Sequence, residues 1–463
     1  MLLHKLNISK STTKRFRHKG LLLALVLAAF QAFGQRFNST QRDVPVPDFR
    51  EVAPEVLVVD VPVSGLPSRI DEAFGLETVQ LAIRHPYVSD VKVELYSPDA
   101  TLVWIANRNG RDGRDYIEAR FSQQGFKGQI SEASAPFTGE YIPDGNLAHF
   151  NNGQNPNGNW VLKVYDLKAG DTGIFNSVSL FFGPNPAKGI TSPCSFSTPK
   201  GCVCADGKKR CWLLPDLALN ERATANNLYE SAFDPKTGKG ELRFAVETFN
   251  IGHGPLEMRG NDRWKCGKKS VSGSVPCNDG TYARQGLDQT IYGLKNGKLI
   301  TQKTPAGFIA YDARPGHEHF HFDNYVTYTL LRPVSGEPDP AKWEVVGRGN
   351  KASFCLWDLG SCREDLKNCV DKNGRTWLPS NMPNYGLGNY RSCDAALQGL
   401  SVGGADLYGE NYEGQSLDLP KGTCNGTYWL KIEIDPDGRI READRSNNTL
   451  ILKTFLNKQQ ECQ

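Results

Sequence analysis

The residues with the clearest chemical potential lie in Gly316-His-Glu-His-Phe-His-Phe322, where three histidines alternate with other side chains. Only four histidines occur after residue 210, and three of them are His317, His319 and His321. On a strand, positions i, i+2 and i+4 face the same side. The first and last Cα atoms then lie roughly 13 Å apart, so the imidazoles can share one ion only if the strand bends or twists. Three neutral imidazoles suit copper, zinc or iron; the alternative is a strand face that is polar by chance.

Further motifs follow the histidines in a defined order. They are Gly349-Asn-Lys-Ala-Ser-Phe-Cys355 with Cys362, Cys393-Asp-Ala-Ala-Leu-Gln-Gly-Leu-Ser401, Asp406-Leu-Tyr-Gly409, Gly426-Thr-Tyr-Trp-Leu-Lys431 and Glu442-Ala-Asp-Arg-Ser-Asn-Asn448. Together with the histidines, this series resembles the catalytic domain of lysyl oxidases. The resemblance extends from about Leu214 to Thr454, and so many ordered motifs over that length are hard to obtain by chance.

The resemblance implies that His317, His319 and His321 bind copper. It also implies that Lys351 and Tyr408 are the precursors of lysine tyrosylquinone, a cofactor that this family builds from its own side chains. A copper-bound tyrosine can be oxidised by dioxygen to a quinone, and an uncharged lysine amine can then add to the ring. A desolvated site favours the uncharged amine. Taken alone, Lys351 would be a surface charge and Tyr408 a packed aromatic residue.

Such a site would oxidatively deaminate primary amines. The amine condenses with the quinone carbonyl, a general base removes a proton from the carbon that bears the nitrogen, and hydrolysis releases an aldehyde. Dioxygen reoxidises the cofactor and yields hydrogen peroxide and ammonia, while the protein supplies position and the base. Asp406 is a candidate base because on an extended segment it shares a face with Tyr408. Peptidyl lysine is the family's precedent as substrate, but small amines and cell-surface polymers are equally compatible with the sequence.

The cysteine framework departs from that of the animal lysyl oxidases. They carry a cysteine before the first copper histidine and cysteines around the quinone tyrosine, where this chain has Gly316, Gly404 and Gly414. A further histidine of the family is Arg314 here, which puts any role for that position in doubt. The resemblance implies a retained bridge between Cys355 and Cys362, and it leaves Cys393 to pair with the additional Cys369. The sequence does not assign the other eight cysteines.

The region 47–183 has the pattern of a β-sandwich. Apolar and polar residues alternate in short runs, as half-buried strands require, and turn sequences such as Asn155-Pro-Asn-Gly158 separate them. Its ordered motifs are His85-Pro-Tyr-Val-Ser-Asp-Val-Lys-Val-Glu-Leu-Tyr-Ser-Pro98, Gly158-Asn-Trp-Val-Leu-Lys-Val-Tyr-Asp166 and Gly170-Asp-Thr-Gly173. These resemble the P domain, or Homo B domain, that follows the catalytic domain of proprotein convertases.

The resemblance to P domains implies a jelly-roll sandwich that stabilises or targets its neighbour, often with bound calcium. Asp90, Asp166 and Asp171 could serve a calcium site, although the residues alone favour solvated loop carboxylates. Because P domains usually accompany a subtilisin-like enzyme, a protease must also be considered. The chain lacks matching Ser, His and Asp blocks, and the surroundings of His253-Gly254 do not fit the histidine block. We therefore expect that the chain is not itself a protease.

Cysteines and charge indicate the compartment. All twelve cysteines lie between Cys194 and Cys462, and an even number in an exported chain predicts disulfides; zinc at Cys202, Cys204 and Cys211 is the alternative. Residues 1–34 combine six basic residues with an apolar run and small residues, as a secretory leader does; an uncleaved anchor is the alternative. Without the leader the formal charge changes from +3 to −3, and no polybasic stripe remains for a nucleic acid.

The sequence thus predicts a mainly β protein with a signal peptide at 1–34 and a P-like jelly-roll domain at 47–183. A linker with a cysteine-rich segment spans 184–210, and a mostly β, disulfide-stapled lysyl oxidase-like domain spans 211–463. We expect a secreted protein without stable membrane insertion, which uses copper, lysine tyrosylquinone, dioxygen and a primary-amine or protein lysine substrate. The alternative is a secreted copper-binding or matrix module that keeps the fold without the quinone. A binding module has no need of the lysine–tyrosine pair, which favours the enzyme.

Overall fold

The computed structural model describes residues 34–50, 55–189, 192–314, 317–349 and 353–462. It consists mostly of strands with little helix, so the predicted mainly β fold class is confirmed. The predicted signal peptide, up to residue 33, lies outside the described residues. Among the described residues, no helix is both long and apolar enough to cross a membrane.

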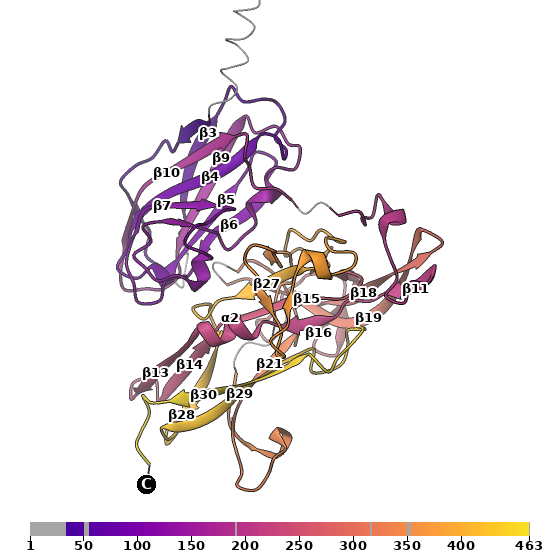
Figure 1. Ribbon diagram of the computed structural model, residues 1–463. Coiled ribbons are helices and arrows are strands. Elements are labelled where there is room, and N and C mark those ends of the chain that lie inside the picture. Colours follow the sequence, from indigo (N-terminus) through magenta and orange to yellow (C-terminus); the bar gives the residue numbers. More distant parts are fainter. Residues whose placement is uncertain (1–33, 51–54, 190–191, 315–316, 350–352, 463) are drawn as a thin grey trace, which may run out of the picture.

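The first part of the chain is a sandwich of two sheets (Figure 1). One sheet has the order β1 (Gln35–Asn38), β10 (Gly173–Gly183), β4 (Gly75–Arg84), β7 (Tyr116–Ser122) and β8 (Glu140–Tyr141), with β2 (Val44–Val46) also on β10. The other has the order β3 (Leu57–Val63), β9 (Gly158–Asp166), β5 (Val91–Tyr96) and β6 (Leu102–Asn107). Short 3-10 helices lie at Val88–Asp90, Ile130–Glu132 and Leu147–His149. Alternate residues of β3 are buried, as the alternating sequence pattern requires.

One apolar core fills this sandwich. Trp160 on β9 is completely buried, and its ring meets Phe150 and Phe182 edge to face at centroid separations of 4.9 and 5.5 Å. Edge-to-face contact is a favourable arrangement of aromatic rings. All the buried residues of this core lie between positions 46 and 187 of the chain.

The second part contains several smaller sheets around a separate core. The largest has the order β17 (Lys269–Val271), β16 (Leu256–Cys266), β18 (Arg284–Lys295), β19 (Lys298–Asp312) and β20 (His319–Phe322), with β11 (Arg210–Leu213) on β18 and β26 (Gln398–Leu400) on β16. A second has the order β12 (Leu217–Leu219), β15 (Val246–Asn250), β27 (Gly404–Tyr408) and β23 (Gly360–Ser361). A third sheet has the order β13 (Leu228–Asp234), β14 (Lys239–Phe244) and β28 (Ser416–Pro420). A fourth has the order β22 (Glu344–Arg348), β21 (Val326–Arg332), β29 (Gly426–Ile434) and β30 (Thr449–Leu456). The last is the pair of β24 (Cys369–Val370) and β25 (Thr376–Trp377).

Helical structure in the second part is short. The α-helix α2 spans Glu221–Asn226, and 3-10 helices lie at Pro199–Gly201, Pro340–Lys342 and Pro379–Asn381. The side chain of Asn220 caps α2 by accepting a hydrogen bond from the Ala223 amide at 3.3 Å. After β29, the Gly438 amide donates to the Asp435 carbonyl at 3.0 Å, and the chain returns as β30 antiparallel to β29. The segment Asp435-Pro-Asp-Gly438 therefore forms the turn that follows β29.

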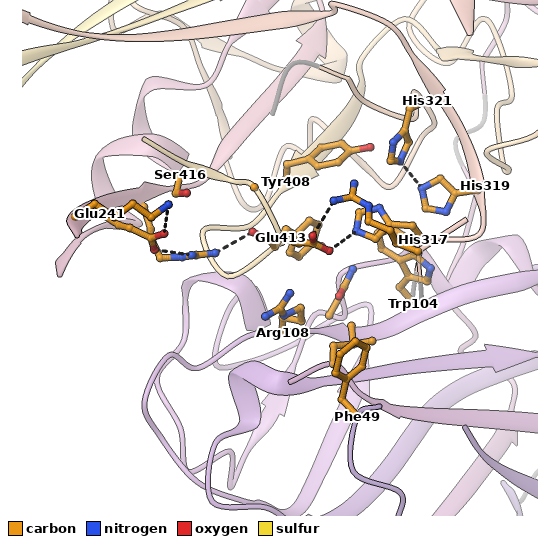
Figure 2. A pocket seen from close by; sticks show the side chains of 17 residues that line it. Phe49, Trp104, Arg108, Glu241, His317, His319, His321, Tyr408, Glu413 and Ser416 are labelled. Atoms are coloured by element: carbon orange, nitrogen blue, oxygen red, sulfur yellow. Dashed lines mark hydrogen bonds and ion pairs between the residues drawn. The ribbon is translucent and has the colours of Figure 1, made fainter. Parts of the chain in front are cut away.

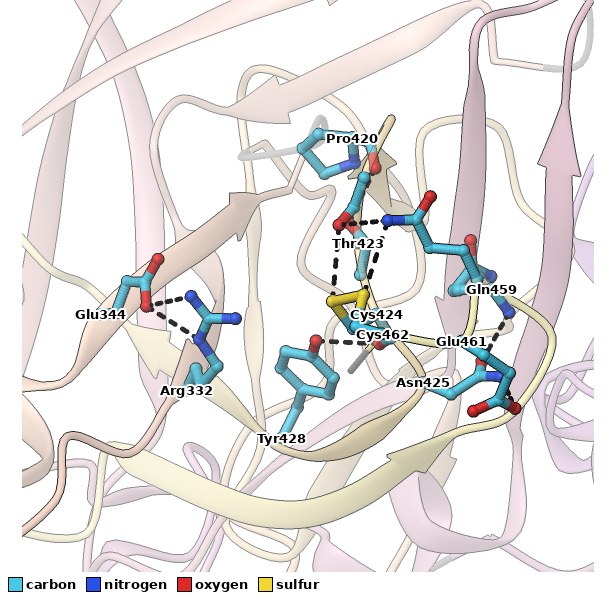
Figure 3. Close-up of a disulfide and its surroundings, with 12 residues drawn as sticks. Arg332, Glu344, Pro420, Thr423, Cys424, Asn425, Tyr428, Gln459, Glu461 and Cys462 are labelled. Carbon is cyan, nitrogen blue, oxygen red and sulfur yellow. Dashed lines mark hydrogen bonds and ion pairs between the residues drawn. A yellow bond between two sulfur atoms is a disulfide. The ribbon is translucent and has the colours of Figure 1, made fainter.

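Six disulfides join all twelve cysteines of the second part, as predicted. The bridges are Cys194–Cys202, Cys204–Cys211, Cys266–Cys277, Cys355–Cys393, Cys362–Cys369 and Cys424–Cys462. They use Cys202, Cys204 and Cys211, so the zinc alternative is wrong. Figure 3 shows the last bridge, which ties the end of the chain to the segment before β29.

Two predicted pairings are wrong, because Cys355 bonds Cys393 rather than Cys362. The backbone explains this. The Phe320 amide donates to the Cys393 carbonyl at 3.1 Å, and Phe322 exchanges backbone hydrogen bonds with Phe354. Strand β20 therefore brings Cys355 and Cys393 together, and Cys362 bonds Cys369 across a separation of seven residues.

The two parts of the chain pack against one another (Figure 1). Trp104 of β6 belongs to the core of the second part, where its ring meets Trp357 edge to face at 4.9 Å. An ion pair of 3.3 Å joins Arg111 to Glu410, and the Asn411 side chain donates to the Arg108 carbonyl at 2.8 Å. This contact places β6 and the following turn over the histidine-bearing end of the second part.

Candidate metal and quinone site

The three histidines converge where the chain enters β20. The strand contains only His319 and His321; His317 lies in the preceding turn, and its amide donates to the Arg314 carbonyl at 3.0 Å. Between them, Glu318 has a φ of +50°, a left-handed conformation that redirects the backbone. This is the bend that convergence of three alternating side chains requires.

The imidazole nitrogens of the three histidines could together hold one metal ion. One ring nitrogen from each lies within 4.8 Å of the other two, and Nε2 of His319 and Nε2 of His321 are 2.8 Å apart. The ring centroids of His317 lie 5.9 and 5.4 Å from those of His319 and His321. Three imidazoles are a donor set that copper, zinc and iron all accept, so these residues fit the copper that the sequence implies.

Asp312, at the end of β19, orients two of the rings. Its Oδ2 lies 3.2 Å from Nδ1 of His317 and 3.5 Å from Nδ1 of His321. A carboxylate that receives one N–H of an imidazole fixes the tautomer and leaves the other nitrogen free to bind a metal. Burial works against ionisation of Asp312, but the hydrogen bond from Arg314 and the charge of His317 outweigh it and lower the pKa to about 2.

Arg314 connects this carboxylate to the cavity wall. Its guanidinium binds Asp312 at 2.9 and 2.5 Å and Glu413 at 2.8 Å, and Oε2 of Glu413 lies 3.9 Å from Nε2 of His317. Sequence reasoning left the role of Arg314 in doubt and did not find Asp312 or Glu413. The spacing of Asp312 from His317 gave no signal, because their contact depends on how the β19–β20 hairpin closes.

Tyr408, the last residue of β27, is buried beside the histidines. Its ring stacks on Phe354 with centroids 3.7 Å apart. Its hydroxyl accepts a hydrogen bond from the Cys355 amide at 2.6 Å and donates to the Cys355 carbonyl at 2.9 Å. Burial, reinforced by the charge of Asp406, raises the pKa of Tyr408 well above its usual value. The phenol is therefore held neutral and fixed in direction.

Lys351 lies outside the described residues, but the segment that follows it is tied to the site. Phe354 pairs with Phe322 at the end of β20 and stacks on Tyr408. Asp406 is buried on β27, where it pairs with Thr248 while Tyr408 pairs with Val246. Tyr408 lines the adjoining cavity, and Asp406 is not among its lining residues.

A cavity of about 580 Å³ lies between the two parts of the chain and contains the site (Figure 2). The second part contributes the three histidines and Tyr408 to its wall, and the first part contributes Phe49, Trp104, Asn107, Arg108 and Leu167. A second cavity of about 610 Å³ shares Trp104, His317 and His319 with the first. The histidines are thus reached along surfaces that both parts form.

The sequence favoured solvated loop carboxylates at the possible calcium ligands of the sandwich. In the structure, however, Asp90 and Asp166 are buried. His85 joins them: Nε2 lies 3.2 Å from Asp166 and 3.6 Å from Asp171, and Nδ1 lies 2.8 Å from the Tyr87 carbonyl. Burial acts to lower the pKa of His85, but the hydrogen bond and the charge of Asp166 outweigh burial, so the pKa of His85 is raised above its usual value. The imidazole of His85 occupies the space between Asp166 and Asp171, whereas calcium takes about six to eight oxygens. Calcium here stays a prediction.

Comparison with known proteins identifies both parts. The proprotein convertase P-domain family matches residues 77–182, and the lysyl oxidase family matches residues 378–462. Both resemblances are confirmed. Tyr408 and Asp406 lie within the lysyl oxidase match, whereas the histidines and Lys351 precede it.

The curated relatives are lysyl oxidases. Protein-lysine 6-oxidase from Gallus gallus is 32% identical over 28% of this chain and 24% of its own length. The enzyme of that name from Sus scrofa is 31% identical over 29% of this chain and 42% of its own. Lysyl oxidase homolog 3 from Homo sapiens is 28% identical over 29% of this chain and 14% of its own. The chain therefore spans less than half the length of the curated relatives it matches.

Among solved structures, a serine protease from Aeromonas sobria in complex with its chaperone is similar at 18% identity, with a TM-score of 0.21. The similarity covers 35% of this chain and 29% of that chain.

Proposed function

We propose that this chain is a copper- and quinone-dependent amine oxidase that converts primary amines, peptidyl lysine among them, to aldehydes with release of hydrogen peroxide and ammonia. The observation that carries the proposal is one cavity lined by both the three converging histidines and Tyr408. His317, His319 and His321 would hold copper. Tyr408 and Lys351 would form the lysine tyrosylquinone, which supplies the electron sink for amine oxidation.

The chain's own residues have distinct tasks in this proposal. Asp312 lies 3.5 Å from Nδ1 of His321, and its charge would leave Nε2 of that ring available to hold copper. The Cys355 backbone holds the Tyr408 hydroxyl in one direction. Asp406 remains the proposed base, and because it does not line the cavity, it would act on a substrate only after the Tyr408 side chain is repositioned.

Secretion is part of the proposal. Six disulfides within one part of the chain suit an oxidising compartment, and residues 1–34 have the composition of an export signal. Dioxygen and a primary amine are the proposed reactants.

The test is peptide mapping of the copper-loaded protein together with a peroxide assay. We expect a cross-linked peptide that contains Lys351 and Tyr408, and peroxide release from a primary amine. Tyr408→Phe and Lys351→Ala should each abolish turnover while copper stays bound, because the histidines are untouched. Tyr428→Phe is the matched control, since the Tyr428 hydroxyl likewise donates to a cysteine carbonyl, that of Cys424, at 2.9 Å.

Replacement of a histidine should have a different signature. His321→Ala is expected to lose copper first and the cross-link as a consequence, because the ring is not oxidised without the metal. If the wild-type protein binds copper but forms no cross-link and no peroxide, the alternative of a non-catalytic copper-binding module is correct. If Tyr408→Phe releases peroxide at the wild-type rate, the quinone assignment is wrong.

A further inference from the structure

The P-like domain contributes a wall to the cavity that contains Tyr408. Figure 2 shows Arg108 and Phe49 of this domain across the cavity from Tyr408 and the histidines. Cavities of 300 to 1,000 Å³ are the usual size for small-molecule sites, and this one of about 580 Å³ falls in that range. Whatever amine reaches Tyr408 through this cavity therefore also contacts the first domain.

Trp104 is one of the side chains that this domain contributes to the cavity wall, together with Asn107 and Arg108. The side chain is only 6% exposed and is fixed by edge-to-face contact with Trp357 and by the Lys92 ammonium 4.5 Å from its ring. Its indole N–H has no hydrogen-bond partner among the described residues. That N–H is itself closed off from the cavity, so Trp104 offers a ligand an apolar ring surface rather than a donor.

Arg108 is the charged group that this domain offers. Its Nε donates to the Ser89 carbonyl at 3.1 Å, and among the described residues the carboxylates of Asp90 and Glu413 act on its charge without forming a direct ion pair. The other three cations of the cavity are paired: Lys239 with Asp418 at 2.7 Å, Arg243 with Glu241 at 3.1 Å and Arg314 with Asp312 at 2.5 Å.

The position of Arg108 is also well defined. Its carbonyl accepts the hydrogen bond from Asn411 of the second part, so the two parts together hold this turn. Burial, followed by the nearby charge of Arg243, lowers the pKa of Arg108 to about 10, which leaves it charged at neutral pH. A half-buried guanidinium with free N–H groups is suited to bidentate recognition of a carboxylate.

We infer that the P-like domain selects the substrate: Arg108 binds a carboxylate carried by the amine that is oxidised at Tyr408. This inference rests on the proposed amine oxidase function. The ligand chemistry is a primary amine at one end and a carboxylate at the other. Its source is either a free amino acid-like molecule or a lysine peptide with a neighbouring acidic side chain.

The test compares two amines of six carbons, hexylamine and 6-aminohexanoate, which differ only in the end opposite the amine. The wild-type protein should show the higher kcat/KM for 6-aminohexanoate. Hydrogen bonds to a charged group contribute about 1.5–3 kcal/mol, so Arg108→Gln should reduce the preference roughly 10- to 100-fold. Arg108→Lys should keep part of it.

Arg114→Gln is the matched control. Arg114 is an exposed arginine of the same domain and does not line the cavity. This change therefore removes the same charge away from the cavity and should keep the preference for 6-aminohexanoate.

Two peptides, acetyl-Gly-Lys-Gly-amide and acetyl-Glu-Lys-Gly-amide, distinguish the two sources of the carboxylate. Preference for the glutamate peptide indicates an acidic protein segment, and preference confined to 6-aminohexanoate indicates a small amino acid.

A binding measurement separates this inference from the proposed function. Calorimetry with 6-aminohexanoate and copper-free protein should detect binding that Arg108→Gln weakens and Arg114→Gln does not. If neither amine is oxidised but this binding is present, the oxidase proposal fails and the recognition stands. If hexylamine is oxidised as well as 6-aminohexanoate, or Arg108→Gln leaves the preference intact, the inference is overturned while the oxidase proposal stands.

Discussion

At the scale of single residues, Asp312 determines how the histidines can be used. Its carboxylate lies 3.2 Å from Nδ1 of His317 and 3.5 Å from Nδ1 of His321, and it is itself held by Arg314. Asp312→Asn removes the charge that supports both rings, and we expect it to weaken copper binding about 10- to 100-fold. Competition with a chelator of known affinity measures this directly.

Asp288→Asn is the control for this change. Asp288 on β18 is also paired with an arginine, Arg263, at 3.3 Å, but it does not line the cavity. Equal copper affinities for Asp312→Asn and the wild-type protein would show that the carboxylate does not orient the ligands.

The sequence could predict the histidines but not their supports. Strict alternation of His317, His319 and His321 is visible along the chain. The support from Asp312 depends on hairpin closure, and Glu413 reaches Arg314 across 99 residues. Tertiary packing determines these contacts, and the periodicity of a single sequence does not reveal which distant residues will meet.

A buried carboxylate beside α2 gives a pH prediction. Burial raises the pKa of Glu247 on β15 to about 7, although the Asn220 side chain donates a hydrogen bond to it. The unfolded carboxyl titrates near pH 4.3, so between about pH 4 and 7 the folded state binds more protons and stability falls as pH rises. Glu247→Gln should flatten this dependence. Urea unfolding at pH 4.5 and 7.5 tests it, and an unchanged slope would contradict the buried-acid account.

At the scale of elements, β20 explains both the cysteine pairing and the fixed phenol. It pairs with the backbone of Cys393 and Phe354, and Cys355 then holds the Tyr408 hydroxyl. The predicted Cys355–Cys362 bridge failed because it was carried over from a family whose surrounding cysteines this chain lacks. The strands of the sandwich were predictable because the alternation of apolar and polar residues is local, and β3 and β9 bury alternate residues as that pattern requires.

Removal of the Cys355–Cys393 bridge should therefore affect the site as well as stability. The bridge spans 38 residues, and so does Cys424–Cys462, shown in Figure 3. Because loop length sets the chain-entropy contribution, replacing either pair with serine should cost a similar free energy of unfolding, about 2–5 kcal/mol. Only Cys355→Ser/Cys393→Ser should also lower the yield of the Lys351–Tyr408 cross-link. Equal cross-link yields in both double variants, measured by mass spectrometry, would disconnect the bridge from the site.

At the scale of the whole molecule, two resemblances to separate families described two units, but neither described the contact between them. From the sequence alone, Trp104 is indistinguishable from an ordinary residue of a β-sandwich strand. In the structure it is a core residue of the other part, together with Trp357 and Tyr412. Each resemblance is limited to one unit, so neither predicts a contact between the two, and this feature was accessible only from coordinates.

Trp104→Ala tests whether that contact holds the two parts together. Truncation of a buried tryptophan costs about 3–5 kcal/mol, here drawn largely from the packing between the parts because the lost contacts are with Trp357 and Tyr412. We expect a larger radius of gyration by small-angle scattering. We also expect two unfolding transitions that lie further apart in temperature than those of the wild-type protein.

Trp343→Ala is the control, since Trp343 meets Trp429 edge to face at 5.1 Å within the second part alone. That variant should lose stability without a change in radius. If Trp104→Ala keeps the wild-type radius and unfolding profile, the ion pair of Arg111 with Glu410 and the hydrogen bond of Asn411 with Arg108 are sufficient to hold the parts together, and the cavity wall does not depend on the tryptophan.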